Sequence, residues 1–453
     1  MNSFFHARSA LSASLLALAC SAQAAVTTEE ASQLKSTLTP MGAEKAGNKD
    51  GSIPAWSPVT APLPGYKPDG SPRPDPFANE KPLYSITGKN MDQHADKLTD
   101  GVKAMLKKLP DYRIDVYPTH RTAGAPQWVY DNVFKNATRA KLVQSSSGLV
   151  PTGAYGGVPF PIPKTGAEVI WNHNLRWQGE SVLLGDKGLM TTADGNKVAV
   201  AWVNDEARQF PYYFKDGNPD SFKGDFLVAQ LINSGPPNRA GEGLVLRFNV
   251  NDDKTQAWVY FPGQRRVRKL PNPCCDTPSP ASAGTLMLDE AGVFTGRISR
   301  FDWKLLGKKE MIVPYNTNKS MQALGELTKG KNFLDPAHVR WELHRVWVVE
   351  ATLAQGQRHP AVRGRYYVDE DTWAAVLADR WDAKGQLWHT LYSLPVLAPD
   401  VAGVSTYTSG YYDLISGSWF VLGEIGDKAQ VRSVSRHQDS LFSPDGLVSE
   451  GVR

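Results

Sequence analysis

From residue 166 to the C-terminus, the chain divides into short hydrophobic runs whose pattern predicts β-strands. The runs are rich in Val, Ile, Trp, Tyr and Phe and are bounded by Gly, Asn, Asp or Pro. Because short turns join successive runs, the pattern predicts antiparallel meanders and not βαβ units. The predicted strands are 167–177, 196–204, 209–215, 226–233, 243–250, 256–262, 265–270, 294–305, 309–313, 340–353, 363–369, 386–394 and 405–415. Two short helices are expected between them, near 317–329 and 370–380.

The first of these predicted strands shows the alternation clearly. A period of two places Val169, Trp171 and His173 on one face, with Ile170 and Asn172 on the other. This pattern predicts a strand with two differently packed faces.

Before residue 150 the hydrophobic positions have the period of helices. Thr27 and Glu30 form a capping box at the start of a helix that continues to about residue 38. Apolar residues three and four positions apart predict a second helix over 91–109. A third helix is expected over 126–142.

Nine prolines occur in residues 54–82, which excludes a helix interior or a central strand there. We expect this segment to wrap the surface in extended form, with Trp56, Tyr66 and Phe77 as anchors. A disordered linker is the alternative. The predicted organisation is a helical and Pro-rich segment, 25–150, packed on an antiparallel β core, 151–453, as one continuous domain.

The first 24 residues have the pattern of a secretory signal peptide. His6 and Arg8 give a weakly basic start, an apolar run covers residues 10–19, and Ala22-Gln23-Ala24 is a cleavage motif. The apolar run is too short to cross a bilayer, which takes about 20 residues. We therefore expect export to the periplasm and a mature chain that begins at Ala25. The alternative is lipidation at Cys20, although Ala17 stands where such signals usually have Leu.

The net charge limits the classes of partner that we expect, and the cysteine content bears on the redox state of the compartment. A formal net charge of +4 is small for 453 residues and argues against a nucleic-acid partner. Apart from Cys20, the cysteines are the adjacent Cys274 and Cys275. An oxidising compartment would let them form a vicinal disulfide, and strained bridges of this kind are the labile ones. A redox or ligand-sensing clasp, a structural bridge and two free thiols remain alternatives.

Residues 257–271 hold the most informative pattern of the chain. An apolar strand, Trp258-Val259-Tyr260-Phe261, leads into the turn signal Pro262-Gly263. The returning strand carries four cations: Arg265, Arg266, Arg268 and Lys269. Such a hairpin can pack aromatic side chains inward and present a basic edge outward.

This hairpin resembles one found in periplasmic proteins related to the outer-membrane lipoprotein carrier, the LolA-type fold. The wider chain resembles an envelope family catalogued as domain of unknown function 1329. In this sequence the resemblance rests on residues 47–56, 157–163, 258–268, 301–311, 313–316, 344–352 and 366–373. One departure follows the hairpin, where Cys275-Asp276-Thr277-Pro278 stands in place of Tyr-Asp-Thr-Pro.

The resemblance implies a mainly β (α+β) fold. A large curved antiparallel sheet, or half-barrel, would carry helices on one side and the Pro-rich segment around it. Its concave face would hold acyl or other apolar groups, because exposing them to water costs about 0.8 kcal/mol per methylene. The aromatic residues we expect to contact such a ligand are Trp171, Trp258, Tyr260, Phe261, Trp303 and Trp347. The alternative is that they fill an ordinary core.

The basic hairpin suggests partners. Its cations would dock on a partner or meet anionic head groups; a solvated strand edge that deters aggregation is the alternative. Proteins with this hairpin often resemble partners of envelope efflux pumps. We therefore expect a hydrophobic small molecule or lipid as ligand, an inner-membrane export pump or an outer-membrane protein as partner, and peripheral membrane contact.

Catalytic signatures are missing from the sequence. There is no G-x-S-x-G, H-E-x-x-H, G-x-x-x-x-G-K-[ST] or G-x-G-x-x-G motif, so we predict no cofactor and no metal. The run Asp369-Glu370-Asp371 suits a helix N-terminus better than a pair of catalytic acids. His344 beside Glu342 could be a general base with its orienting group, or a satisfied, half-buried histidine. We predict a periplasmic carrier, with an enzyme acting on envelope polysaccharide or lipid as the alternative.

Overall fold

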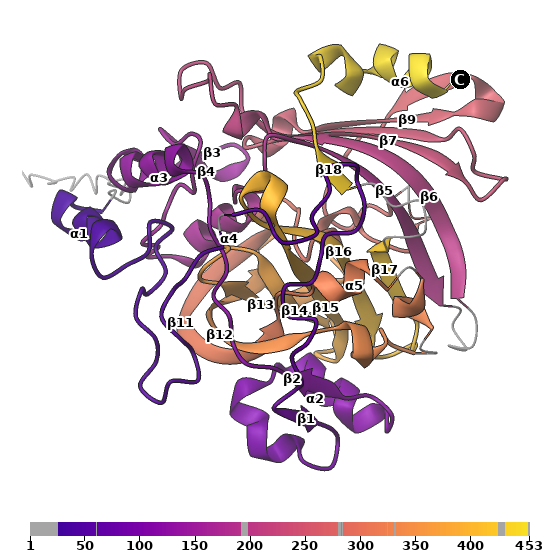
Figure 1. Ribbon diagram of the computed structural model, residues 1–453. Helices are drawn as coiled ribbons and strands as arrows, with labels where there is room; N and C mark the ends of the chain where they lie inside the picture. Colours follow the sequence, from indigo (N-terminus) through magenta and orange to yellow (C-terminus); the bar gives the residue numbers. More distant parts are fainter. Residues whose placement is uncertain are drawn as a thin grey trace, which may run out of the picture.

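The computed structural model describes residues 26–59, 61–191, 198–279, 282, 284–323, 325–329, 332–424 and 431–451. The predicted signal peptide and Cys20 lie outside these described residues. Sixteen strands of the described part form one large sheet (Figure 1), in the order β1-β2-β12-β13-β14-β15-β16-β17-β5-β6-β7-β8-β9-β10, with β11 beside β12 and β18 beside β5. All of its pairings are antiparallel except that between β2 and β12.

The bounds of the strands are as follows. The main sheet contains β1 (Tyr84–Ile86), β2 (Ile114–Val116), β5 (Ser181–Thr191), β6 (Val198–Gln209), β7 (Asp225–Gly235), β8 (Gly243–Asn249), β9 (Gln256–Phe261), β10 (Arg266–Lys269), β11 (Phe301–Pro314), β12 (Trp341–Leu353), β13 (Ala361–Asp369), β14 (Ala375–Asp382), β15 (Leu387–Ala398), β16 (Gly403–Asp413), β17 (Trp419–Glu424) and β18 (Val431–Ser433). A separate hairpin pairs β3 (Lys141–Ser145) with β4 (Gly148–Thr152).

The predicted fold class is confirmed. The protein is mainly β, and its large sheet curves without closing. The hairpin at residues 256–270 is present as β9 and β10, with Val267 opposite Tyr260 and Lys269 opposite Trp258. The predicted strands 294–305 and 309–313 are one strand, β11, which begins at Phe301 and has an irregular register between Leu305 and Gly307.

The helices are few: α1 (Thr28–Ser32), α2 (Asp100–Lys108), α3 (Gln127–Arg139), α4 (Gly166–Asn174), α5 (Asn318–Met321) and α6 (Pro444–Gly451). The predicted helix 91–109 is divided, because Leu98 is extended and Thr99 caps a new helix. In Figure 1, α6 lies against β7 and β9 at one end of the sheet. No helix of the described residues is long and apolar enough to cross a membrane.

The prediction of a strand at 167–177 is wrong, since this segment is the buried helix α4. Thr165 and Glu168 form a capping box, in which each side chain accepts a hydrogen bond from the other's backbone N–H. Every residue from Gly166 to His173 is buried. A helix that is buried on all sides lacks the usual hydrophobic period, so alternation alone could not distinguish it from a strand. The capping box was the signal that could have identified it.

Two further predictions are corrected by the turn chemistry. Residues 370–374 form a tight turn into strand β14, not a helix, with Trp373 at a φ of 59°. Asp369 holds this turn by accepting hydrogen bonds from the N–H and hydroxyl of Thr372. The predicted strand 209–215 is a short 3₁₀ helix at Pro211–Tyr213, because proline fits the first turn of a helix. Strands β1 to β5, β14, β17 and β18 were not predicted.

The Pro-rich segment wraps the sheet as expected. Trp56 donates its indole N–H to the Ala123 carbonyl at 2.8 Å, and Phe77 stacks on His120 at 4.1 Å. Arg73 is fully buried and binds Asp400 through two hydrogen bonds of 2.8 and 2.7 Å. The first two contacts hold the segment against residues 120–123, and the third holds it against a 3₁₀ turn 327 residues further along the chain.

Candidate functional site

A cavity of about 140 Å³ lies between the curved sheet, the end of α4 and a segment that follows β10. This volume is close to that of an engineered apolar cavity, about 150 Å³, that accepts benzene. Most of its lining is apolar: Trp202, Phe210, Phe226, Leu227, Ala229, Leu231, Leu244, Leu246, Phe248, Leu286, Leu288 and Leu422. The described residues therefore line a space suited to a small apolar group.

Alternation along two neighbouring strands builds one wall of the cavity. On β7 the residues Leu227, Ala229 and Leu231 face it, and their partners across the sheet on β8 also line it. The residues between them, Val228 and Gln230, point to the other side of the sheet, where they contact Phe442 and Leu441. Sequence alternation indicated these faces, but it could not tell which face borders a cavity.

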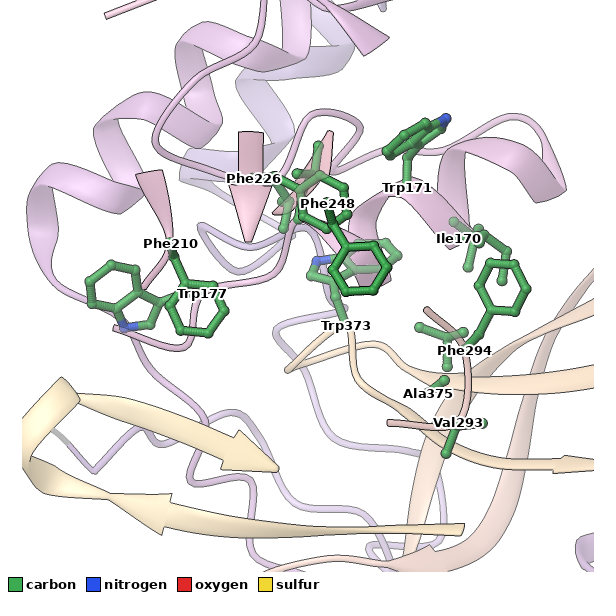
Figure 2. Packing of buried hydrophobic residues seen from close by; sticks show 14 of the residues in the cluster. Ile170, Trp171, Trp177, Phe210, Phe226, Phe248, Val293, Phe294, Trp373 and Ala375 are labelled. Carbon is green, nitrogen blue, oxygen red and sulfur yellow. The ribbon is translucent and has the colours of Figure 1, made fainter. Parts of the chain in front are cut away.

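A second wall is aromatic. Phe226 and Phe248 have ring centroids 6.3 Å apart, and Phe226 also meets Trp171 of α4 edge to face. Figure 2 shows these rings beside Phe210 and Trp177 in the largest buried cluster. Rings in this arrangement pack tightly and give the wall a defined shape.

One end of the cavity is polar. Arg176, two residues beyond α4, lines it together with Gln178, Arg208 and Thr406. Burial, with repulsion from Arg208, lowers the pKa of Arg176 to about 9. Arg208 is itself paired with Glu206 at 2.7 Å. The Arg176 guanidinium stays charged at neutral pH.

Residues 284–295, here called the cover segment, close one side of the cavity with Leu286, Leu288 and Ala291. Buried charges hold this segment to the sheet. Asp289 lies 3.1 Å from Arg380, and Glu290 lies 2.6 Å from His389.

Both contacts shift pKa values. Although burial opposes it, Arg380 and His359 hold the pKa of Asp289 well below its ordinary value. Burial lowers the pKa of His389, but the carboxylates of Glu290 and Asp413 outweigh it and raise that pKa overall.

None of the six aromatic residues expected to bind the ligand lines this cavity. Trp258 and Tyr260 lie on the face of β9 that α6 covers, where Tyr260 and Val245 pack against Leu447. Phe261 is half-buried at the end of the same strand. This side of the sheet is opposite the cavity wall, because Val245, which pairs with Trp258, alternates with the cavity residues of β8.

The other three aromatic residues belong to the central packing. Trp171 is buried on α4 and donates its indole N–H to the Leu149 carbonyl. Trp303 packs against Phe294 and donates to the Ile298 carbonyl. Trp347 is half-buried and stacks on Trp373. The structure thus separates the six residues into different environments.

The four cations of the hairpin are all exposed, on the strand at one edge of the sheet. No carboxylate lies within 4 Å of them among the described residues. Lys269 covers the ring of Trp258 at 5.7 Å. Cys274 and Cys275 follow the hairpin as a buried vicinal disulfide, and Cys275 has a φ of 62°.

A second polar cluster lies on the other half of the sheet. His344 is buried, stacks on Tyr315 at 3.8 Å and contacts Glu342 at 3.0 Å. Histidine and two acids, His344, Asp369 and Asp371, place ligand atoms within 4.8 Å of one another and could hold a metal ion. Burial and the charge of Asp371 raise the pKa of Asp369 to about 7.

Arginines compensate the acidic run that we expected at a helix N-terminus. Arg121 binds both oxygens of Asp371, at 2.9 and 2.7 Å, and donates to the carbonyls of Glu44, Ala46 and Pro54. Glu370 contacts Arg345 and Lys308. The acids therefore anchor the N-terminal segment, and no local pattern in the sequence indicates partners 250 residues away.

Comparison with known proteins agrees with the resemblance in the sequence. The family described as protein of unknown function DUF1329 matches residues 85–448. "Uncharacterized protein PA3922" of Pseudomonas aeruginosa is 38% identical over 446 residues, which cover 96% of each chain.

Solved structures with a similar arrangement are more distant. A DUF1329 family protein from Desulfovibrio piger matches 62% of this chain and 97% of its own, with a TM-score of 0.43 and 15% identity. A putative outer membrane lipoprotein-sorting protein domain from Vibrio parahaemolyticus matches 62% and 98%, with a TM-score of 0.43 and 13% identity. A LolA superfamily protein from Nitrosomonas europaea has a TM-score of 0.37, 11% identity, and matches 63% of this chain and 100% of its own. The extent of the family match and the identity to the Pseudomonas protein show that this chain belongs to the DUF1329 family.

Proposed function

We propose that this protein is a periplasmic carrier that binds a hydrophobic, lipid-like molecule. The observation that carries the proposal is the apolar cavity beneath β6, β7 and β8, closed by the cover segment. An apolar cavity of this size stays dry and binds apolar guests. A larger surface depression, about 530 Å³, is lined by the charged residues Glu180, Lys215, Asp400 and Arg436 and suits such a guest poorly.

Export supports the carrier role, because the periplasm is an aqueous space that lipids must cross to reach the outer membrane. The signal peptide and the cleavage after Ala24 remain predictions from the sequence. Sequencing the N-terminus of the secreted protein tests them, with Ala25 as the expected first residue.

The basic hairpin would bring the carrier to its donor membrane. Arg265, Arg266, Arg268 and Lys269 project from one sheet edge, and none of them has a carboxylate partner in the described part of the chain. Cations near an anionic leaflet each contribute about 1 kcal/mol of attraction. We favour a membrane surface with anionic head groups as the docking partner, with an inner-membrane export pump or an outer-membrane protein as the alternative.

Two measurements test the carrier. Organic extraction of the purified protein, followed by mass spectrometry, is expected to release a lipid. Binding of the hydrophobic fluorophore N-phenyl-1-naphthylamine should then weaken in Leu231→Trp, which fills the cavity. The matched control is Leu83→Trp, since Leu83 is 64% exposed. The absence of both a co-purified lipid and a difference between these variants would contradict the proposal and favour the enzyme alternative.

A further inference from the structure

Arg176 is held at the polar end of the cavity by neutral groups only. Its guanidinium donates to the His173 carbonyl at 2.7 Å, to the Thr406 hydroxyl at 2.8 Å and to the Gln178 amide oxygen at 3.1 Å. The nearby ring of His173 is neutral, because burial lowers its pKa and its Nδ1 accepts a hydrogen bond from the Ala375 N–H. These contacts fix the position of the cation without neutralising it.

The fully buried arginines of the described residues all have carboxylate partners, whereas Arg176 is half-buried. Arg73 binds Asp400, Arg121 binds Asp371, Arg340 binds Glu342, Arg345 binds Glu370 and Arg380 binds Asp289. Arg176 has no carboxylate within 4 Å in the described part of the chain. Since burying an unpaired charge costs several kcal/mol, proteins normally pair such groups. Arg176 lacks such a partner and lies at the polar end of a mostly apolar cavity.

Among the residues that the structure describes, the charges that line the cavity do not balance. Arg176 and Arg208 contribute two positive charges, and Glu206, which is paired with Arg208, contributes one negative charge. One positive charge is left over at the end of a hydrophobic space. The complement of this arrangement is a molecule with an apolar chain and one anionic end.

We propose that the cavity binds an anionic amphiphile, whose carboxylate or phosphate head pairs with Arg176 and whose apolar chain lies along β7 and β8. This inference rests on the proposed carrier function and specifies its ligand. Guanidinium groups bind both carboxylates and phosphates through paired hydrogen bonds. Leu227, Ala229 and Leu231 form the wall that the chain would follow away from the head.

The test compares ligands that differ only in the head group. Delipidated full-length protein is titrated with decanoate, decyl phosphate, decanol and decyltrimethylammonium, which compete with N-phenyl-1-naphthylamine. We expect at least one of the two anions to bind at least about tenfold more tightly than decanol, as a charge-assisted hydrogen bond allows. The preferred anion identifies the head group as carboxylate or phosphate.

Variants of Arg176 test whether this residue causes the preference for an anionic head group. Arg176→Gln should abolish the preference for the anion while keeping decanol binding within about twofold, and Arg176→Lys should retain part of the preference. If decanol binds the original protein as tightly as both anions, the inference is refuted and the carrier function stands. If no ten-carbon ligand binds, both are refuted. The comparison in the original protein decides the question even where a variant fails to fold.

Discussion

Arg121 is the residue whose removal should most clearly expose how the N-terminal segment is held. Its side chain and that of Asp371 are each 1% exposed and share two hydrogen bonds of 2.9 and 2.7 Å. Among the described residues, Asp371 has no other hydrogen-bond or ion-pair partner. Arg121→Met keeps the approximate length of the side chain but leaves this carboxylate buried and alone. Breaking a buried pair in this way costs about 3–5 kcal/mol, a large part of the stability of about 5–15 kcal/mol that is typical of proteins.

Urea unfolding followed by tryptophan fluorescence measures this loss. The double variant Arg121→Met/Asp371→Asn should lose less than the single Arg121→Met, because no stranded charge remains. Hydrogen exchange should also accelerate around residues 44–54, whose carbonyls lose their donor. The control is Lys103→Met, which breaks an exposed pair with Asp100 and should cost less than about 0.5 kcal/mol. A loss below about 1 kcal/mol in Arg121→Met would refute the anchoring role.

Three further predictions concern pH and the membrane. Burial, and then the charge of Asp371, raise the pKa of Asp369 from 3.8 to about 7. The folded protein therefore binds this proton more tightly than the unfolded chain does, so the free energy of unfolding should fall as the pH rises through the range between these two pKa values. Asp369→Asn should flatten that fall in urea titrations at pH 4 to 8. The carboxylates of Glu290 and Asp413 outweigh burial and raise the pKa of His389 above 6.5. The ion pair between protonated His389 and Glu290 therefore stabilises the closed cover segment fully below pH 6.5, and this stabilisation is lost as the pH rises through the raised pKa. The rate of fluorophore uptake should increase with pH in the original protein, and His389→Gln should remove this dependence. Equal pH profiles of uptake in the two proteins would contradict this prediction. Arg266→Glu/Arg268→Glu should weaken sedimentation with phosphatidylglycerol vesicles at least tenfold, given about 1 kcal/mol for each basic residue near the surface. Fluorophore binding should not change, and an equal effect of charge reversals on α2 would indicate nonspecific attraction.

The strands were predictable where their residues alternate and their turns are local. The hairpin of β9 and β10 has an apolar strand, a Pro-Gly turn and a basic strand in succession, so residues within 15 positions define it. Helix α4 was missed because burial on all sides removes its hydrophobic period. Strand β5 includes Gly185, Asp186, Lys187 and Gly188, a composition typical of turns, and only its pairing with β6 and β17 makes it a strand.

The cavity could not be predicted from local sequence. Its lining comes from α4, five strands or turns of the sheet and the cover segment, which are far apart along the chain. Trp258 and Tyr260 were predicted to contact the ligand because they are large and aromatic, but the pleat of β9 directs their side chains to the face that α6 covers. Arg176 is a single arginine after a helix, and its unpaired charge becomes evident only when all its neighbours are known.

The size of the cavity sets a condition on the length of the ligand. A volume of about 140 Å³ suits a guest of about the size of benzene, so a ten-carbon chain must displace the cover segment. Displacement breaks the contacts of Asp289 with Arg380 and of Glu290 with His389, each worth about 1.5–3 kcal/mol as a hydrogen bond between charged groups. Burial of a chain contributes about 0.8 kcal/mol per methylene, so roughly four to eight methylenes balance the two contacts. Affinity should therefore be weak up to about this length and should rise steeply beyond it, whereas a variant without the Glu290 carboxylate should bind shorter chains.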